Sequence, residues 1–138
     1  MALPYFNFSY PEPTGVVYAV APNESSLIGL ISIIAPIIAG GNTVVVLASD
    51  SKPLCSITFA EVLHTSDVPG GVVNILTGHR SELLDHFSSH MDVNAIVYCG
   101  TDNDEITLVQ QNAALNVKRP VVYTDQDWMD NTVQDPYR

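Results

Sequence analysis

Two histidines four residues apart, His86 and His90, are the candidate metal ligands of this 138-residue sequence. On a helix this spacing places both imidazoles on one face, where Asp85 or Asp92 could complete a zinc site. A solvated helix face needs the same kinds of polar residues and is far more common. We therefore expect no metal site here.

Nucleophilic side chains are the next candidates for chemistry. The two cysteines, Cys55 and Cys99, are too few for a disulfide framework and have no metal-ligand spacing. The sequence contains no Gly-x-Ser-x-Gly elbow and no His-Glu-x-x-His motif, and no glycine-rich nucleotide fingerprint follows the first apolar run. His64 and His79 have no evident partners. These patterns predict no catalytic centre.

The elements that must position any site alternate between strand-like and helix-like segments. Apolar runs predict strands at residues 15–20, 43–47, 72–76, 95–99 and 120–123, with helices at residues 27–39, 53–64, 81–90 and 104–115. Continuous apolar strands are typical of strands buried on both faces, and intervening helices favour crossovers between parallel strands. The pattern predicts an α/β fold: a doubly wound, Rossmann-like five-stranded parallel sheet with helices on both faces.

Length and composition fit one domain over residues 1–138. The hydrophobic content of 46% is sufficient for a core. Residues 1–13, rich in aromatic residues and proline, are expected to form an extended lead-in, and residues 125–138 a polar tail. Trp128, Met129 and Tyr137 in that tail could dock on a partner, although we expect a disordered tail.

The charge balance excludes several classes of partner. Five Lys and Arg oppose 15 Asp and Glu, a formal net charge of −10, so we expect neither a nucleic acid nor a membrane as partner. The longest apolar run, residues 27–39, is too short to span a bilayer. No secretion signal opens the sequence, so we expect a cytoplasmic protein. Because only 14% of the residues are charged, part of the surface is a candidate contact with another chain or segment.

Five strings of residues carry a family resemblance by their order and spacing. They occupy residues 13–17 (PTGVV), 35–45 (APIIAGGNTVV), 68–78 (VPGGVVNILTG), 89–94 (SHMDVN) and 98–101 (YCGT). Together they resemble the NAD-binding domain of the aldehyde dehydrogenase superfamily over about residues 13 to 124. The resemblance implies a domain from NAD(P)-dependent oxidoreductases that act on aldehydes. Among these, the second, degenerate dehydrogenase-like region of family 16 aldehyde dehydrogenases matches best.

The resemblance implies cofactor-binding positions at Pro22, Asp50, Gly78, Gly100 and Thr101. In the family, loops at these positions hold NAD. Asp50 keeps a polar role toward the adenosine ribose, and the Thr101 hydroxyl would lie near the pyrophosphate. The resemblance implies no metal cofactor.

The catalytic positions of the family carry other residue types here. Glu24 falls where the family has an asparagine that helps to hold an oxyanion, and a carboxylate there opposes the growing negative charge. Tyr123 falls where the family has its general base. The family's nucleophilic cysteine belongs to a second domain, and neither Cys55 nor Cys99 falls in its place. The resemblance therefore implies no catalytic residue in this chain.

Several cofactor positions are changed as well, so NAD binding stays an open alternative. Leu47 replaces a lysine that holds the ribose, and Arg80 replaces a glycine near the adenine, where an arginine would crowd the cleft. Asp102, Asp104 and Glu105 fall beside the pyrophosphate, although acids at a helix N-terminus also complement its dipole. At about 5 Å and an effective dielectric of about 20, each like-charge pair costs roughly 3 kcal/mol, whereas millimolar affinity amounts to about 4 kcal/mol.

Two functions follow from these observations. The first is a non-catalytic, degenerate aldehyde-dehydrogenase-like domain that acts as a structural or interaction module. Its partner would be the remainder of a dehydrogenase-like chain or a second copy in a homo-oligomer. The alternative is the NAD-binding portion of an active aldehyde dehydrogenase, an oxidoreductase whose catalytic cysteine lies outside this chain. The changed positions favour the first function, that of a pseudoenzyme.

Overall fold

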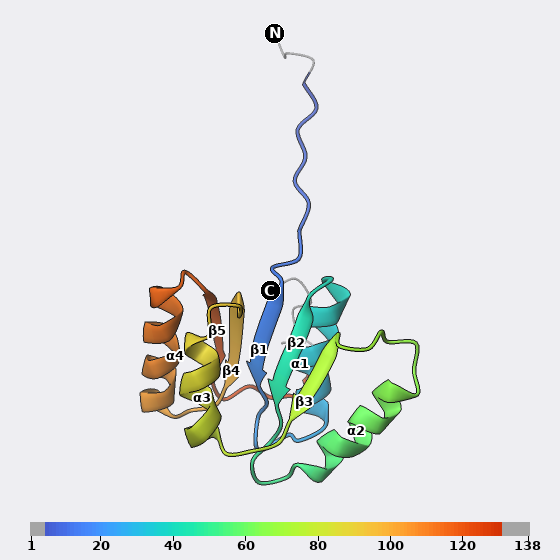
Figure 1. Ribbon diagram of the computed structural model, residues 1–138, viewed down its shortest axis with the longest axis vertical. Coiled ribbons are helices and arrows are strands. Elements are labelled where there is room, and N and C mark those ends of the chain that lie inside the picture. The colour runs from blue at the N-terminus through green and yellow to red at the C-terminus, as the bar shows by residue number, and fades with distance from the viewer. Residues whose placement is uncertain (1–4, 131–138) are drawn as a thin grey trace.

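Five short strands form one parallel sheet in the order β3-β2-β1-β4-β5 (Figure 1). The structure is a computed structural model that describes residues 5–130. The strands are β1 (Val16–Val20), β2 (Thr43–Leu47), β3 (Val73–Leu76), β4 (Ala95–Cys99) and β5 (Arg119–Tyr123). The helices are α1 (Ile28–Ala39), α2 (Leu54–His64), α3 (Arg80–Ser89) and α4 (Asn103–Leu115).

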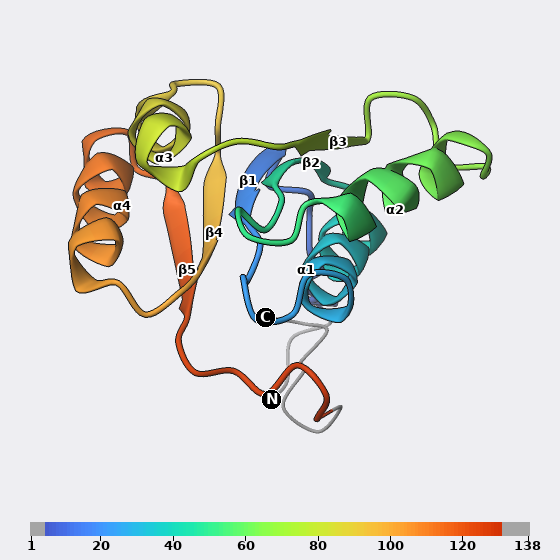
Figure 2. The same ribbon diagram turned by 90° about the horizontal axis from the view of Figure 1, so that it is seen from below.

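Helices cover both faces of the sheet, with α1 and α2 on one side and α3 and α4 on the other (Figure 2). The predicted doubly wound α/β fold is confirmed. Every predicted end of a strand or helix lies within one residue of the observed end, because glycine, proline and capping residues bound the apolar runs. None of the helices within residues 5–130 is long and apolar enough to cross a membrane.

Strand β1 separates two cores because its side chains alternate between the two faces of the sheet. Tyr18 and Val20 belong to a buried cluster with side chains from α3 and α4. Ala19 and Ala21 point the other way and pack with side chains from α1 and β2. All four are fully buried, which explains the absence of polar alternation in this strand.

Two asparagines fix the amino-terminal end of β1. The Oδ1 atom of Asn42 accepts hydrogen bonds from the backbone N–H groups of Thr14 (2.6 Å) and Gly15 (3.0 Å). The Oδ1 atom of Asn94 accepts one from the N–H of Val16 (2.9 Å). These bonds give the first donors of the strand a partner and tie β1 to the segments that open β2 and β4.

The segments before and after the sheet, residues 5–13 and 125–130, differ in whether they pack against the core. Residues 5–13 form no helix or strand and extend away from the sheet, as expected of a lead-in (Figure 1). At the other end, Trp128 is only 6% exposed and belongs to the core on the α1 side. The prediction of a disordered tail is therefore wrong for residues 125–130. Residues 1–4 and 131–138, with Tyr137, lie outside the described residues.

Lys118 is a buried cation that closes the C-terminal end of α3. Its Nζ atom donates hydrogen bonds to the backbone carbonyls of Ser88 (2.8 Å) and His90. The Nδ2 atom of Asn116 donates to the carbonyl of Ser89 (3.1 Å). The last carbonyls of a helix have no partner within it, so these side chains take the place of water. Burial lowers the pKa of Lys118, and the carbonyls offset part of that desolvation.

Replacing Lys118 by methionine keeps the length of the side chain and removes its donors. We expect Lys118→Met to lower the free energy of unfolding by about 2 kcal/mol, because two buried carbonyls lose a charged donor. Urea unfolding followed by circular dichroism measures the change. Lys52→Met, at an exposed lysine, is the matched control, with an expected change below about 0.5 kcal/mol. Equal losses in the two variants would contradict the capping role.

Candidate functional site

The sheet changes its winding direction between β1 and β4. The chain leaves β1 toward α1 on one face and leaves β4 toward α4 on the other (Figure 2). Doubly wound sheets bind their ligands at such a point, outside the carboxyl ends of the strands. We call this place the switch-point site and define it by Ala21, Arg80, Tyr98, Gly100 and Glu105.

The five predicted cofactor positions lie in loops at this same edge of the sheet. Pro22 follows β1 and is buried against Gly29 of α1, where a Cβ atom would collide with its ring. The others follow the next strands along the chain: Asp50 after β2, Gly78 after β3, and Gly100 and Thr101 after β4. Asp50 and Thr101 are exposed, and the two glycines are half-buried.

Side chains join three of these loops. The Oδ1 atom of Asn23 accepts hydrogen bonds from the Ser49 hydroxyl (3.1 Å) and the Asp50 N–H (3.0 Å). An Oδ1 atom of Asp50 lies 3.0 Å from Nδ1 of His79. His79 therefore has a partner, contrary to the expectation from the sequence. With the His79 side chain 70% exposed, this pair adds little to stability, but it engages the carboxylate predicted to bind ribose.

Arg80 fills the switch-point site from the first position of α3. Its Nη2 atom donates a hydrogen bond of 2.5 Å to the backbone carbonyl of Ala21. Its Nη1 atom lies 4.0 Å from Oε2 of Glu105, and only 11% of the arginine side chain is exposed. The sequence-based expectation was that this arginine would crowd the cleft, and the observed side chain lies directly between the ends of β1 and α4.

Glu105 connects this arginine to Tyr98 on β4. The Tyr98 hydroxyl donates a hydrogen bond of 2.5 Å to Oε2 of the Glu105 carboxylate. Burial, and then the bond to Glu105, raises the pKa of the Tyr98 hydroxyl. The hydroxyl therefore stays protonated at neutral pH and acts as a donor. Arg80, Glu105 and Tyr98 form one cluster whose formal charges cancel.

Glu24, which the sequence resemblance places at the family's oxyanion position, also has a partner within the chain. One of its carboxylate oxygens, Oε1, accepts a hydrogen bond of 3.2 Å from the indole N–H of Trp128. The indole lies edge-on to the ring of Tyr123, with 5.9 Å between the ring centroids. The sequence resemblance places Tyr123 at the position of the family's general base. Glu24 and Tyr123 thus both contact Trp128, which packs residues 125–130 against the core.

The two thiols differ in their surroundings. Cys99 is buried at the end of β4, and burial raises the pKa of its thiol to about 12. It is therefore protonated and shielded from reagents at neutral pH. Cys55 is exposed on α2.

The histidine pair on α3 does not gather a set of metal ligands. The rings of His86 and His90 are 6.2 Å apart between centroids, and Asp92 lies 4.0 Å from His90. Across residues 5–130, no three histidine, cysteine or acidic side chains converge on a point where they could hold a metal ion.

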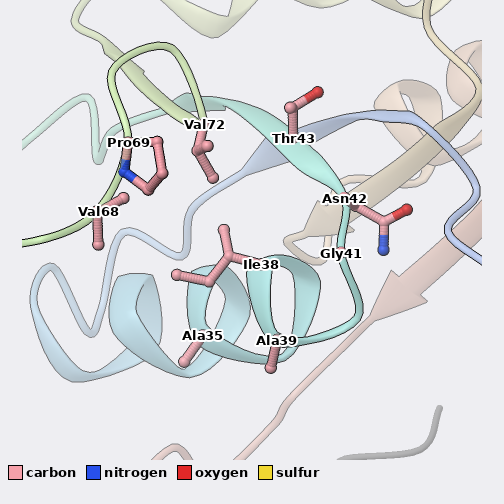
Figure 3. Close-up of a pocket in the computed structure, with 9 residues that line it drawn as sticks. All are labelled: Ala35, Ile38, Ala39, Gly41, Asn42, Thr43, Val68, Pro69 and Val72. Carbon is pink, nitrogen blue, oxygen red and sulfur yellow. The ribbon is translucent and has the colours of Figure 1, made fainter.

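Two open hollows lie at the opposite edge of the sheet, where the strands begin. One, of about 520 Å³, lies between the C-terminal half of α1 and the loop before β3. Figure 3 shows Ile38 pointing toward the loop that carries Val68, Pro69 and Val72. The other, of about 470 Å³, is lined by residues from the lead-in and from the starts of β4 and β5. Neither contains a residue of the switch-point site.

The sequence analysis missed three contacts at the carboxyl edge: the Asn23 bridge between loops, the docking of Trp128 on the core of its own chain, and the pairing of His79 with Asp50. One signal was available for Trp128, because a lone tryptophan within a polar segment rarely stays in water. Asn23 lies in the loop after β1, and asparagine side chains in loops and turns often accept hydrogen bonds from backbone N–H groups. Nothing in the sequence placed His79 beside Asp50.

The thiol environments predict selective labelling. At pH 8, we expect iodoacetamide to modify Cys55 alone, because the Cys99 thiol is buried and protonated. Mass spectrometry should find one adduct on the wild type and on Cys99→Ser, and none on Cys55→Ser. Two adducts on the folded wild type would contradict this assignment.

The raised pKa of the Cys99 thiol also predicts how stability depends on pH. The free energy of unfolding should fall as the pH rises from about 9 toward 12, because a cysteine in the unfolded chain ionises at about 8.5 whereas the buried thiol stays protonated.

Trp128 is the single tryptophan of the chain, so its fluorescence reports the docking of the tail. We expect Glu24→Ala to shift the emission to longer wavelength and to increase quenching by acrylamide, because the indole loses its acceptor. Glu12→Ala, at an exposed acid of the lead-in, is the matched control and should leave the emission unchanged. An unchanged spectrum in both variants would show that Glu24 does not hold the indole.

Comparison with known proteins gives the family. The model of the aldehyde dehydrogenase family matches residues 3–124. A hydroxyisobutyraldehyde dehydrogenase from Mycolicibacterium austroafricanum is 34% identical over 124 residues, which cover 84% of this chain and 25% of the relative. Aldehyde dehydrogenase 1A1 from Homo sapiens is 30% identical over 140 residues, covering 94% of this chain and 28% of the relative.

Solved structures agree with these relatives. A mutant of aldehyde dehydrogenase C from Pseudomonas syringae, in complex with NAD+ and octanal, matches with a TM-score of 0.78 and 34% identity over 82% of this chain and 23% of that one. An apo betaine aldehyde dehydrogenase from Staphylococcus aureus matches with a TM-score of 0.76 and 30% identity, over 82% and 22%. The chain spans about a quarter of the length of the relatives it matches. Sequence, fold and comparisons agree that this chain belongs to the aldehyde dehydrogenase family.

Proposed function

We propose that this chain is a non-catalytic, degenerate aldehyde-dehydrogenase-like domain that acts as a structural or interaction module of a larger protein. The observation that carries the proposal is the position of Arg80, which lies at the switch-point site between Ala21 and Glu105. A ligand bound outside the carboxyl ends of β1 and β4 would have to displace this side chain from its hydrogen bond.

The charges at this edge also oppose a dinucleotide. An Oδ1 atom of Asp102 accepts hydrogen bonds from the backbone N–H groups of Asp104 (2.9 Å) and Glu105 (3.4 Å). The N-terminal donors that would hold a phosphate on α4 are therefore bound to a carboxylate. A pyrophosphate would meet these acids, and Glu105 neutralises the nearby arginine.

The family's catalytic positions support the same conclusion. Glu24 and Tyr123, at the oxyanion and general-base positions, both contact the indole of Trp128. A carboxylate that accepts a hydrogen bond from the tail cannot donate one to an oxyanion. The buried thiol of Cys99 is protonated at neutral pH.

An apolar surface on α1 and α2 supports a role as a module. Helix α1 carries no charged residue, yet its Ile28 and Ile31 side chains are exposed. Leu54 and Ile57 on α2 are exposed as well, Leu54 by 78%. Both helices lie on the same face of the sheet (Figure 2), and exposed apolar side chains that form a patch are typical of surfaces that contact other protein. We propose the remainder of a larger chain, or a second copy, as the partner.

The alternative, the NAD-binding portion of an active aldehyde dehydrogenase, has one observation in its favour. The related Pseudomonas syringae structure holds NAD+ and octanal, and the five positions expected to bind the cofactor here share one edge of the sheet. Under this alternative, Arg80 would swing out when NAD enters.

An NAD titration separates the two functions. We expect no saturable change in the amide spectrum of the 15N-labelled 138-residue chain up to about 5 mM NAD, because binding must displace Arg80 and overcome the acids of α4. Shifts are monitored at Asp50, Gly78, Gly100 and Thr101.

Saturable shifts at those four residues would overturn the proposal and favour the alternative. Glu105→Gln is the matched variant, since it removes one of the opposing charges and keeps the size of the side chain. If NAD bound to this variant and not to the wild type, charge would be the dominant barrier.

A further inference from the structure

The two groups that Arg80 faces at the switch-point site, a backbone carbonyl and a carboxylate, are hydrogen-bond acceptors. Its Nη2 atom donates to the carbonyl of Ala21 (2.5 Å), and its Nη1 atom faces the carboxylate of Glu105 at 4.0 Å. No basic side chain other than Arg80 contributes a hydrogen bond or an ion pair to this site among the described residues. Backbone carbonyls and carboxylates hold cations and repel phosphates.

An aromatic face provides a second contact for a flat cation. The Cζ atom of Arg80 lies 5.8 Å from the centroid of the Tyr98 ring, within the range of a cation–π interaction. The hydroxyl of the same ring donates to Oε2 of Glu105, so the aromatic face and the carboxylate are fixed relative to each other. A guanidinium group can use both, because it is planar and carries several donors in one plane.

The space for the guanidinium depends on Gly100. A Cβ atom on this residue would lie 2.7 Å from the Tyr98 hydroxyl oxygen and 3.0 Å from Nη1 of Arg80. A larger residue would push the ring and the cation apart. The Nε atom of Arg80 is buried and makes no hydrogen bond within the described residues, so the cation is held through its two terminal nitrogens.

From these contacts we propose that the switch-point site is a guanidinium-binding site, occupied in this chain by its own Arg80. Without that side chain, the carbonyl of Ala21, the carboxylate of Glu105 and the face of Tyr98 bind a free guanidinium ion. This inference rests on the proposed function in one respect, since both start from Arg80 as the resident occupant of the site in the ligand-free chain. It adds the chemical class of the ligand, a planar organic cation.

Chemical rescue tests the proposal in the 138-residue chain. Arg80→Ala leaves the acceptors and removes the cation, so its melting temperature should fall by several degrees. Guanidinium chloride at about 50 mM should then raise the melting temperature by roughly 2–5 °C relative to sodium chloride of equal ionic strength. The same salt should slightly lower the melting temperature of the wild type, because guanidinium is otherwise a denaturant.

Two variants control for general effects of the salt. Arg119→Ala removes an exposed arginine at the other edge of the sheet and should be destabilised by guanidinium, as the wild type is. Arg80→Ala combined with Glu105→Gln lacks the carboxylate and should lose the rescue. Tetramethylammonium chloride, a cation that is not flat and has no N–H donors, should not rescue Arg80→Ala.

A folded Arg80→Ala chain that guanidinium does not stabilise would overturn the proposal. If this variant does not fold, the native chain provides the test through the Nη–H signals of Arg80 in NMR spectra, because the terminal nitrogens make the contacts of the site. We expect these protons to exchange slowly with water in the wild type and at least tenfold faster in Glu105→Gln. Equal exchange in the two would overturn the proposal as well. NAD binding by the wild type would overturn the proposed function alone, because the guanidinium titration contains no NAD.

Discussion

The central strand β1 must be buried on both faces, and the rest of the fold follows from this constraint. Its neighbouring residues Tyr18 and Ala19 point to opposite sides and are both fully buried, so a helical layer is needed on each side of the sheet. Right-handed crossovers then place α1 and α2 on one face and α3 and α4 on the other. The change of direction between β1 and β4 is a consequence of this winding, and it determines where the switch-point site lies.

Local signals explain how much of the fold was predictable. Residues 40–42 (GGN) end a helix and begin a strand, and the apolar runs of β2 and β4 match the predicted ranges. The contacts of the candidate site join segments far apart in the chain: Arg80 binds Ala21 across 59 residues, and Trp128 binds Glu24 across 104. The sequence shows only that these residue types differ from those that the family has at the same positions. Which side chains contact each other depends on the strand order and on the rotamers, and local sequence patterns determine neither.

Helix α3 is held at both ends by buried or nearly buried cations. At its N-terminus Arg80 reaches across to the carbonyl of Ala21, and at its C-terminus Lys118 binds the carbonyls of Ser88 and His90. These contacts fasten the helix to the end of β1 and to the start of β5. The switch-point site at one end of α3 and the start of β5 at the other are therefore joined through this helix.

The inward orientation of Arg80 and Lys118 changes the charge that the molecule presents to its surroundings. Two of the five basic side chains are directed inside, and one of these is paired with Glu105, which leaves at most three basic side chains against the other 14 acidic ones. At low ionic strength such surfaces repel one another, and this repulsion is screened beyond about 10 Å at 0.1 M salt. Association between copies through the apolar face of α1 would therefore strengthen with added salt, the opposite of an interface held by ion pairs.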